Sequence, residues 1–163
     1  MIKDVTNVKL ENLVIRGGIA TNDSSYPDYL GGGIYVSKVS YLVIESNVVI
    51  RNNSANDGGG GLYLGYSTYT TISGSVYGNS ATNYGGGLYL YYSSNNTISG
   101  SVYSNSANNS GGGLYLANSD YFTNIGWITN NNAYSGGGVY TNGSHPNSYF
   151  GNVSDNSPDD IAP

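Results

Sequence analysis

The sequence contains no cysteine and very little charge. The missing cysteines exclude a disulfide scaffold, thiol catalysis and thiolate metal sites. Charged residues make up 9% of the 163 residues, against roughly a quarter in a typical globular protein. The five basic side chains all lie in the first third of the chain: Lys3, Lys9, Arg16, Lys38 and Arg51. With a net charge of −5 and no basic stripe, the chain is not expected to bind nucleic acid.

Long apolar runs are also missing. No segment approaches the roughly 18 apolar residues of a membrane span, so we expect no membrane insertion. The first residues lack the basic and then apolar layout of a signal peptide. If the protein is exported, we expect this chain to be a processed or excised form. The length predicts a single domain spanning residues 1–163.

A repeat dominates the composition, which includes 25 Gly and 18 Tyr. Three glycines, one aliphatic residue and one tyrosine follow each other five times along the chain. The aliphatic residues are Ile34, Leu62, Leu88, Leu114 and Val139. Another apolar residue follows the tyrosine in most copies, and this alternation is typical of a β-strand whose tyrosine faces outward.

A second repeated string consists of Ile or Val, two variable residues, Asn, and most often Ser and Ala. Its asparagines are Asn53, Asn79, Asn105, Asn131 and Asn156. The segment 12–20 aligns with 47–55 and indicates a diverged first unit. The repeat therefore predicts about six units of roughly 25–28 residues.

A unit of this length without helical periodicity predicts an all-β fold, a right-handed parallel β-helix with about three short strands per coil. We expect a diverged N-terminal coil at 1–33, regular coils at 34–61, 62–87, 88–113 and 114–138, and a C-terminal coil with cap at 139–163. Stacking places equivalent residues about 4.8 Å apart. Charged ladders would repel, whereas stacked asparagines can bond to their copies, so we expect the five asparagines to form an internal ladder.

At these two strings the sequence resembles bacterial surface proteins of the polymorphic outer-membrane-protein type. Their paired repeats have the form Phe-x-x-Asn and Gly-Gly-Ala-(Ile/Leu/Val), laid on a right-handed parallel β-helix of the pectin-lyase-like superfamily. Here Ile or Val replaces the Phe, and the third Gly replaces the Ala. The resemblance implies secretion and a role in adhesion or extracellular structure.

The outward tyrosines are the candidate ligand-binding residues: Tyr35, Tyr63, Tyr89, Tyr115 and Tyr140, supplemented by Tyr66, Tyr92, Tyr77 and Tyr103. A structural interpretation is that these rings stabilise neighbouring strands. A functional interpretation is that they stack on the sugar rings of an extended glycan.

A polysaccharide lyase or hydrolase is a further alternative. Glycoside hydrolysis needs two facing carboxyl groups, and after Arg51 only the aspartates at the C-terminal end lie near each other: Asp155, Asp159 and Asp160. We interpret them as a polar cap, with calcium binding as the alternative. His145 has no partner for a triad or a metal site and is expected to be an exposed turn residue. We therefore predict no catalytic residues, no metal site and no cofactor.

Together these patterns predict a non-catalytic, extracellular or cell-surface β-helix. We expect it to be an adhesin module or a fibre subunit that assembles by stacking its end coils, through self-association between the basic first coil and the acidic last segment. The alternative is a polysaccharide-binding module that uses its tyrosine ladders. A host surface or a glycan is then the expected ligand.

Overall fold

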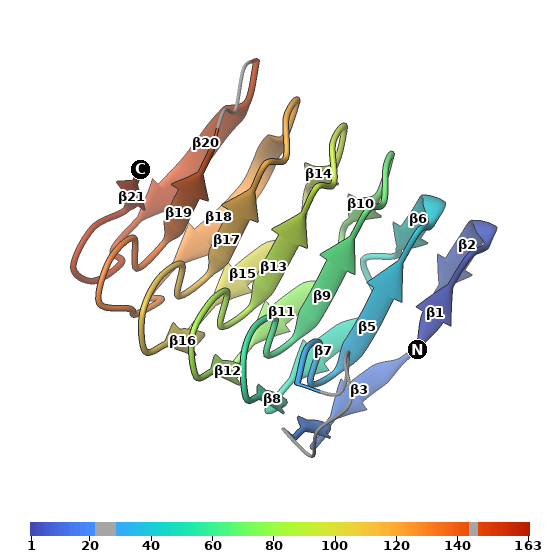
Figure 1. Ribbon diagram of the computed structural model, residues 1–163, viewed down its shortest axis with the longest axis horizontal. Helices are drawn as coiled ribbons and strands as arrows, with labels where there is room; N and C mark the ends of the chain where they lie inside the picture. The colour runs from blue at the N-terminus through green and yellow to red at the C-terminus, as the bar shows by residue number, and fades with distance from the viewer. Residues whose placement is uncertain (22–28, 144–146) are drawn as a thin grey trace.

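The computed structural model describes residues 1–21, 29–143 and 147–163, and these form a parallel β-solenoid (Figure 1). Every strand pair in it is parallel, and successive coils stack along one axis. The predicted all-β parallel helix is confirmed. The solenoid has about five turns, a small difference from the six predicted. The N-terminal unit contributes strands to all three sheets, whereas the last unit has no strand in the third sheet.

Three sheets make up the wall. The first sheet has seven strands, in the order β1 (Ile2–Lys3), β5 (Ile34–Ser37), β9 (Leu62–Gly65), β13 (Leu88–Tyr91), β17 (Leu114–Ala117), β19 (Val139–Asn142) and β21 (Ile161–Ala162). The third sheet has four strands: β16 (Ser106–Ala107), β12 (Ser80–Ala81), β8 (Ser54–Ala55) and β4 (Ile19–Ala20). The first sheet carries the Gly-Gly-Gly-aliphatic-Tyr repeat, so it holds the predicted tyrosine column.

The second sheet is split along most of its length into two columns. One column contains β2 (Thr6–Leu10), β6 (Ser40–Ile44), β10 (Thr71–Ile72) and β14 (Thr97–Ile98). The other contains β3 (Val14–Arg16), β7 (Val49–Arg51), β11 (Ser75–Tyr77) and β15 (Ser101–Tyr103). The long strand β18 (Thr123–Thr129) joins the columns, and β20 (Tyr149–Ser154) pairs with it. A regular coil thus has four short strands where the sequence predicts three, because one sheet is interrupted.

The core is a set of aliphatic columns inside the coil. Alternate residues of each strand point inward, so Leu62, Leu88 and Leu114 lie in register and are fully buried. Val76 and Val102 form a matching column from the second sheet. These contacts bury apolar side chains along the whole axis, and this burial is the main source of stability.

The glycine triplets enter the first sheet through a tight turn. Gly85 has a positive φ of 60°, a conformation that costs other residues energy. A Cβ atom on Gly86 would collide with the backbone carbonyl of Ser106 in the next coil. The triplet therefore combines a left-handed backbone at Gly85 with close contact between coils at Gly86.

The predicted asparagine ladder is also confirmed. Each side-chain nitrogen donates to the side-chain oxygen of the next asparagine at 3.0 Å, along Asn53, Asn79, Asn105, Asn131 and Asn156. The same oxygens also accept a bond from the preceding ladder residue's backbone N–H. Each nitrogen donates a second bond to a backbone carbonyl of the preceding coil. The ladder therefore satisfies backbone groups that burial would otherwise leave unpaired.

Asp160 ends this ladder. Its Oδ1 atom accepts bonds from the backbone nitrogen and the side-chain nitrogen of Asn156, both at 3.0 Å. These are the two bonds that Asn156 itself accepts from Asn131 one coil earlier. The carboxylate of Asp160 thus takes the place of the next asparagine, which agrees with the predicted polar cap.

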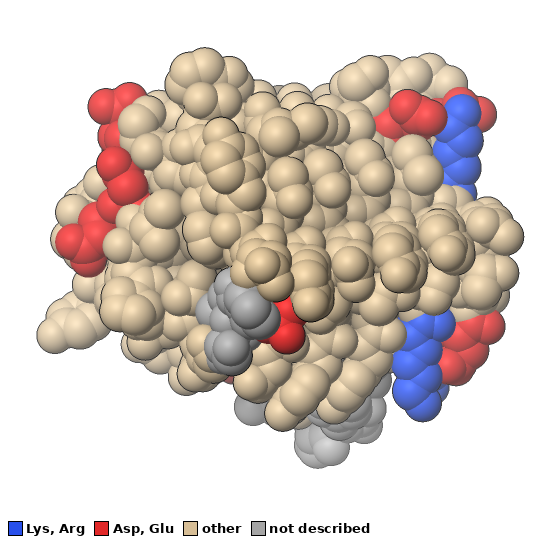
Figure 2. Space-filling view, turned by 90° about the horizontal axis from the view of Figure 1, so that it is seen from above, with Lys and Arg blue, Asp and Glu red and all other residues tan. Residues whose placement is uncertain are grey.

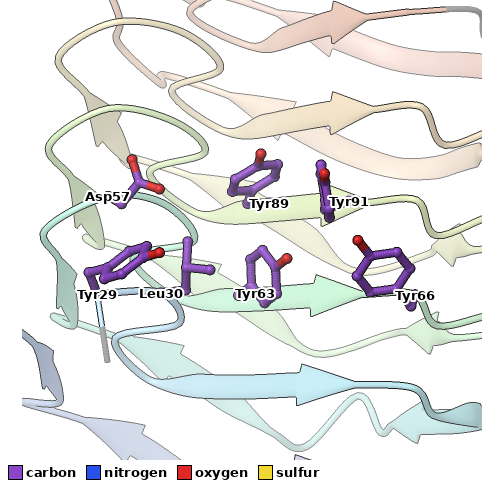
Figure 3. A pocket seen from close by; sticks show the side chains of 7 residues that line it. All are labelled: Tyr29, Leu30, Asp57, Tyr63, Tyr66, Tyr89 and Tyr91. Carbon is purple, nitrogen blue, oxygen red and sulfur yellow. The ribbon is translucent and has the colours of Figure 1, made fainter. Parts of the chain in front are cut away.

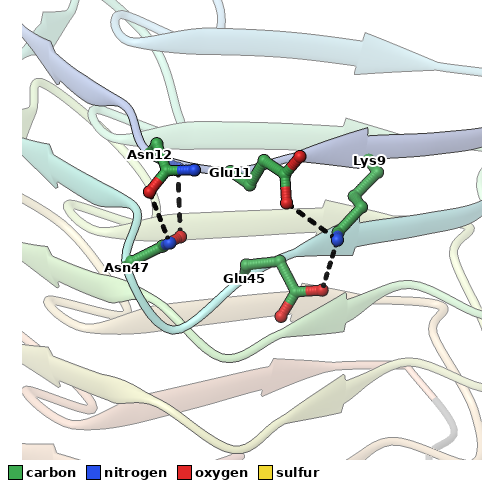
Figure 4. Close-up of polar contacts among 5 residues, drawn as sticks. All are labelled: Lys9, Glu11, Asn12, Glu45 and Asn47. Carbon is green, nitrogen blue, oxygen red and sulfur yellow. Dashed lines mark hydrogen bonds and ion pairs between the residues drawn. The ribbon is translucent and has the colours of Figure 1, made fainter.

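Charged side chains gather at the two ends of the solenoid, with a nearly uncharged wall between them (Figure 2). At the N-terminal end, Lys9 Nζ lies 2.8 Å from a carboxylate oxygen of Glu11 and 3.3 Å from one of Glu45 (Figure 4). Beside this cluster, Asn47 Nδ2 donates a hydrogen bond to Asn12 Oδ1 at 2.8 Å, and the backbone N–H of Asn12 donates one to Asn47 Oδ1 at 3.0 Å. The two hydrogen bonds to Glu11 and Glu45 raise the pKa of Lys9. No helix suited to crossing a membrane occurs in the described parts of the chain.

Candidate tyrosine binding site

The predicted tyrosine column lies outside the core, on the first sheet, in the expected register. Tyr35 stacks on Tyr63 with ring centroids 5.2 Å apart, and Tyr115 stacks on Tyr140 at 5.3 Å. Tyr89 stands edge-on between the two stacks, at 5.3 Å from Tyr63 and 5.0 Å from Tyr115. The five rings are therefore one continuous aromatic ladder.

The expectation that this column is an exposed face is wrong at three of its five positions. Tyr35, Tyr63 and Tyr115 are buried, and only Tyr89 and Tyr140 are partly exposed. The reason is that the turns leading into the sheet fold back over the rings. Leu30 packs with Tyr35 and Tyr63 in a second hydrophobic cluster, and Tyr84 lies 4.7 Å from Tyr115. Ligand binding by the column therefore stays a prediction, and it applies only to the partly exposed rings of Tyr89 and Tyr140.

The ladder opens into one pocket of about 270 Å³. We call it the tyrosine pocket, and its lining residues are Tyr29, Leu30, Asp57, Tyr63, Tyr66, Tyr89 and Tyr91. Tyr63 and Tyr66 come from one coil and Tyr89 and Tyr91 from the next, while Asp57 lies on the preceding turn (Figure 3). Five phenol rings and a single carboxylate thus converge from neighbouring coils.

The rings of the pocket face in different directions. Tyr66 and Tyr91 meet edge to face at 5.4 Å and 86°, and Tyr89 and Tyr91 at 6.2 Å and 76°. Burial raises the pKa of Tyr89, and the nearby Tyr115 and Asp57 raise it further. Burial also raises the pKa of Tyr115, whose hydroxyl accepts a bond from Asn142 Nδ2 at 3.0 Å. These phenols are therefore neutral hydrogen-bonding groups at physiological pH.

A second group of tyrosines lies where the chain passes from the first sheet to the second, on the turn itself or, for Tyr41, at the start of β6. We call this group the tyrosine rim, and it consists of Tyr41, Tyr66, Tyr69, Tyr92 and Tyr121. Each is between 50% and 54% exposed. Tyr66 stacks on Tyr92 at 5.7 Å and Tyr41 on Tyr69 at 5.1 Å. Tyr66 belongs to both groups, so the pocket and the rim are continuous.

Every residue of the tyrosine rim has a left-handed backbone, with φ between 47° and 60°. This conformation is unfavourable for a bulky side chain by roughly 1–2 kcal/mol. In other coils the same two positions hold other residues, among them asparagine, which tolerates this backbone. They are Asp4, Lys38, Asn118 and Gly143 in one column, and Asn7, Asn95 and Asn147 in the other. The fold therefore does not require tyrosine at these positions, and its presence points to a use of the exposed rings.

The supplementary pair Tyr77 and Tyr103 lies apart, on the second sheet, where the rings stack at 4.8 Å and are half-buried. The sequence had indicated Tyr66 and Tyr92 but not Tyr41, Tyr69 or Tyr121 as ligand contacts. It also missed Asp57, which joins the tyrosines only through the folding of the turns. His145 lies outside the described residues.

A buried serine column beneath the rim was not predicted either. The hydroxyl oxygens of Ser67, Ser93 and Ser119 accept bonds from the backbone of the preceding coil at 2.9–3.0 Å. This column fixes the turn on which the rim stands. In the sequence these serines differ from the many others only by their regular spacing of 26 residues, so the pattern is hard to recognise.

Residues 33–161 match the model of a family described as periplasmic copper-binding protein (NosD). The chain belongs to the NosD family. This match, together with the solenoid, confirms the prediction of a parallel β-helix repeat protein in the pectin-lyase-like superfamily. No curated protein and no solved structure matches the chain.

Proposed function

We propose that this NosD-family β-helix is a non-catalytic glycan-binding module located outside the cytoplasm, and that it binds through the tyrosine pocket and the tyrosine rim. The observation that carries the proposal is the placement of half-exposed tyrosines at left-handed turn positions where the same chain uses asparagine elsewhere. Exposed aromatic rings are rigid and amphipathic, which suits stacking on sugar rings. The family's periplasmic description supports the location.

A binding role without catalysis is supported by the lining of the pocket. Hydrolysis of a glycosidic bond uses two carboxyl groups about 5–9.5 Å apart. Among the described residues that line the tyrosine pocket, Asp57 is the one carboxylate, beside five tyrosines and a leucine. The raised pKa of Tyr89 disfavours its phenolate and makes it a poor base.

Copper binding, which the family's description names, does not fit the residues of this chain. Proteins hold copper with imidazole, thiolate or thioether ligands. The chain has no Cys, one Met and one His. Within residues 1–21, 29–143 and 147–163, no three His, Cys, Asp or Glu side chains are placed to hold a metal ion. We therefore assign this chain no copper-dependent role.

Adhesion would follow from glycan binding if the glycan belongs to a host or neighbouring cell. Fibre formation by coil stacking stays a separate prediction. Its support is the gathering of charge at the two ends of the solenoid. Against it stands Asp160, which already occupies the acceptor position that an asparagine of a further coil would take.

The proposal is tested by affinity electrophoresis of the purified chain in gels that contain xylan, hydroxyethylcellulose, glycol chitosan or alginate. We expect retardation in at least one neutral or amine-bearing polymer. The double variant Tyr66→Asn/Tyr92→Asn should lose this retardation, because it removes both exposed rings. The turn should still form, because Asn118 occupies the same position in another coil with a left-handed backbone.

Tyr134→Ala is the matched control, because Tyr134 is 85% exposed and contributes to neither tyrosine group. This variant should be retarded like the unmodified chain. Mobility unchanged by all four polymers, or retardation that survives the double variant, would refute the proposal.

A further inference from the structure

We infer that the tyrosine pocket binds a ligand carrying an alkylammonium group, and that Asp57 is the counter-ion of that group. This inference deepens the proposed function and rests on it. It names the class of ligand: a glycan with free amino groups, or a compound with a quaternary ammonium headgroup. Both present the same cationic chemistry to the pocket.

The first observation is that no basic side chain among the described residues forms an ion pair with Asp57. The ion pairs among the described residues all lie at the N-terminal end: Lys3 with Asp4, and Lys9 with Glu11 and Glu45. The residues from Gly58 to Ser119 include no charged side chain. Among the described residues that line the pocket, Asp57 is the one with a carboxyl group, and it is half-buried. A half-buried carboxylate favours an oppositely charged partner.

The second observation is how Asp57 is held. Its Oδ1 atom accepts a bond from Asn83 Nδ2 at 2.7 Å, and Asn83 in turn accepts one from Asn109 Nδ2 at 3.1 Å. These amides form a chain that points toward the carboxylate, and each bond polarises the next. The two amides thereby hold the carboxylate of Asp57 in a fixed orientation through its Oδ1 atom.

The third observation is the aromatic wall. The negative faces of phenol rings attract cations, and several rings turned in different directions form a cage for an ammonium group. Tyr66, Tyr89 and Tyr91 provide such a wall, with angles of 86° between Tyr66 and Tyr91 and 76° between Tyr89 and Tyr91. The field of Asp57 that helps to raise the pKa of Tyr89 also favours a bound cation.

The same electrostatics exclude other ligands. An acidic polysaccharide would bring its carboxylates to a negative pocket on a chain of net charge −5, and like charges repel. A neutral glycan would gain ring stacking but no ion pair. The ammonium ligand gains both, so the preference for it over a neutral analogue is the measurable consequence.

The test is isothermal titration calorimetry at about pH 6, where a sugar amine is protonated. The probes are the hexamer of β-1,4-linked glucosamine, the N-acetylated hexamer of the same length, cellohexaose and choline chloride. We expect the glucosamine hexamer to bind at least about tenfold more tightly than its N-acetylated form. Because surface ion pairs are screened, 1 M NaCl should reduce the difference.

Asp57→Asn should abolish this preference while stacking on the neutral hexamers remains, since the change keeps shape and removes charge. Asp120→Asn is the matched control, because Asp120 is also half-buried but lies outside the pocket lining. This variant should keep the preference. Circular dichroism of both variants verifies the fold.

Two sources of the ammonium group are distinguished by the choline arm. Asp57-dependent choline binding as tight as that of the glucosamine hexamer would identify a quaternary headgroup, and weaker binding an amino sugar. Equal affinity for the acetylated and free hexamers, together with no Asp57-dependent binding of choline, would overturn the inference and leave glycan binding intact. Failure of every probe, together with unchanged mobility in the polymer gels, would overturn the proposed function as well.

Discussion

Two turns of the coil carry repeated side chains, but one turn buries identical residues whereas the other exposes different ones. In the turn between the second and third sheets, the same asparagine recurs from Asn53 to Asn156, with most copies buried and every amide bonded. Where the chain passes from the first sheet to the second, the residue varies among aspartate, lysine, tyrosine, asparagine and glycine and reaches solvent, although all share a left-handed backbone. The comparison shows that a buried turn requires the same residue in every coil, because each amide must bond to its copies. An exposed turn has no such requirement, so its side chain can serve in binding.

The largest effect is expected where the buried ladder is broken. Asn105→Ala removes the acceptor for the backbone nitrogen and the side chain of Asn79, and the donor to the carbonyl of Val76. Unpaired buried groups cost about 1–3 kcal/mol each, so we expect a loss of roughly 3–5 kcal/mol. Urea unfolding followed by circular dichroism measures this loss. Asn109→Ala, in the exposed amide chain, should lose less than about 1 kcal/mol, and equal losses would contradict the comparison.

An intermediate effect of opposite sign is expected at Asn124. This side chain is fully buried in register with Ile98, and both of its polar atoms lack a partner among the described residues. It is thus a buried asparagine without a ladder. Asn124→Ile should raise the free energy of unfolding by about 1–3 kcal/mol, as measured by urea unfolding. Destabilisation would mean that this amide is satisfied, for example by ordered water.

The smallest effect is expected on the tyrosine rim. Tyr121 has φ of 52° and lies in the column that also contains Asn95 and Asn147. Tyr121→Asn should stabilise the fold by roughly 0.5–1 kcal/mol, because asparagine tolerates this backbone better. Thermal unfolding gives the sign. As a control, Tyr103→Asn, at a strand position half-buried against Tyr77, should destabilise. If both Tyr121→Asn and Tyr103→Asn stabilise the fold, the gain is not specific to the left-handed positions. The argument that rim tyrosines lower stability and are present for binding would then fail.

The candidate site was predictable only in part. The column from Tyr35 to Tyr140 follows from spacing, but its burial depends on turns that fold back over it. The contact between Leu30 and Tyr63 joins residues of different coils, and no local pattern encodes it. Asp57 joins the tyrosine pocket for the same reason. Three residues of the tyrosine rim, Tyr41, Tyr69 and Tyr121, escaped prediction because tyrosine is rarely found in a left-handed backbone conformation.

The sequence by itself determined the coil: a period near 26 residues, inward aliphatic residues, glycine turns and an asparagine at each level. It could do so because stacking converts each repeated position into a column of identical neighbours, so one unit specifies the next. The tertiary structure alone decided which outward side chains are covered and which carboxylate meets the aromatic rings. Those outcomes depend on where non-repeating turns pack against the wall, and that packing is set by contacts between coils rather than by the period.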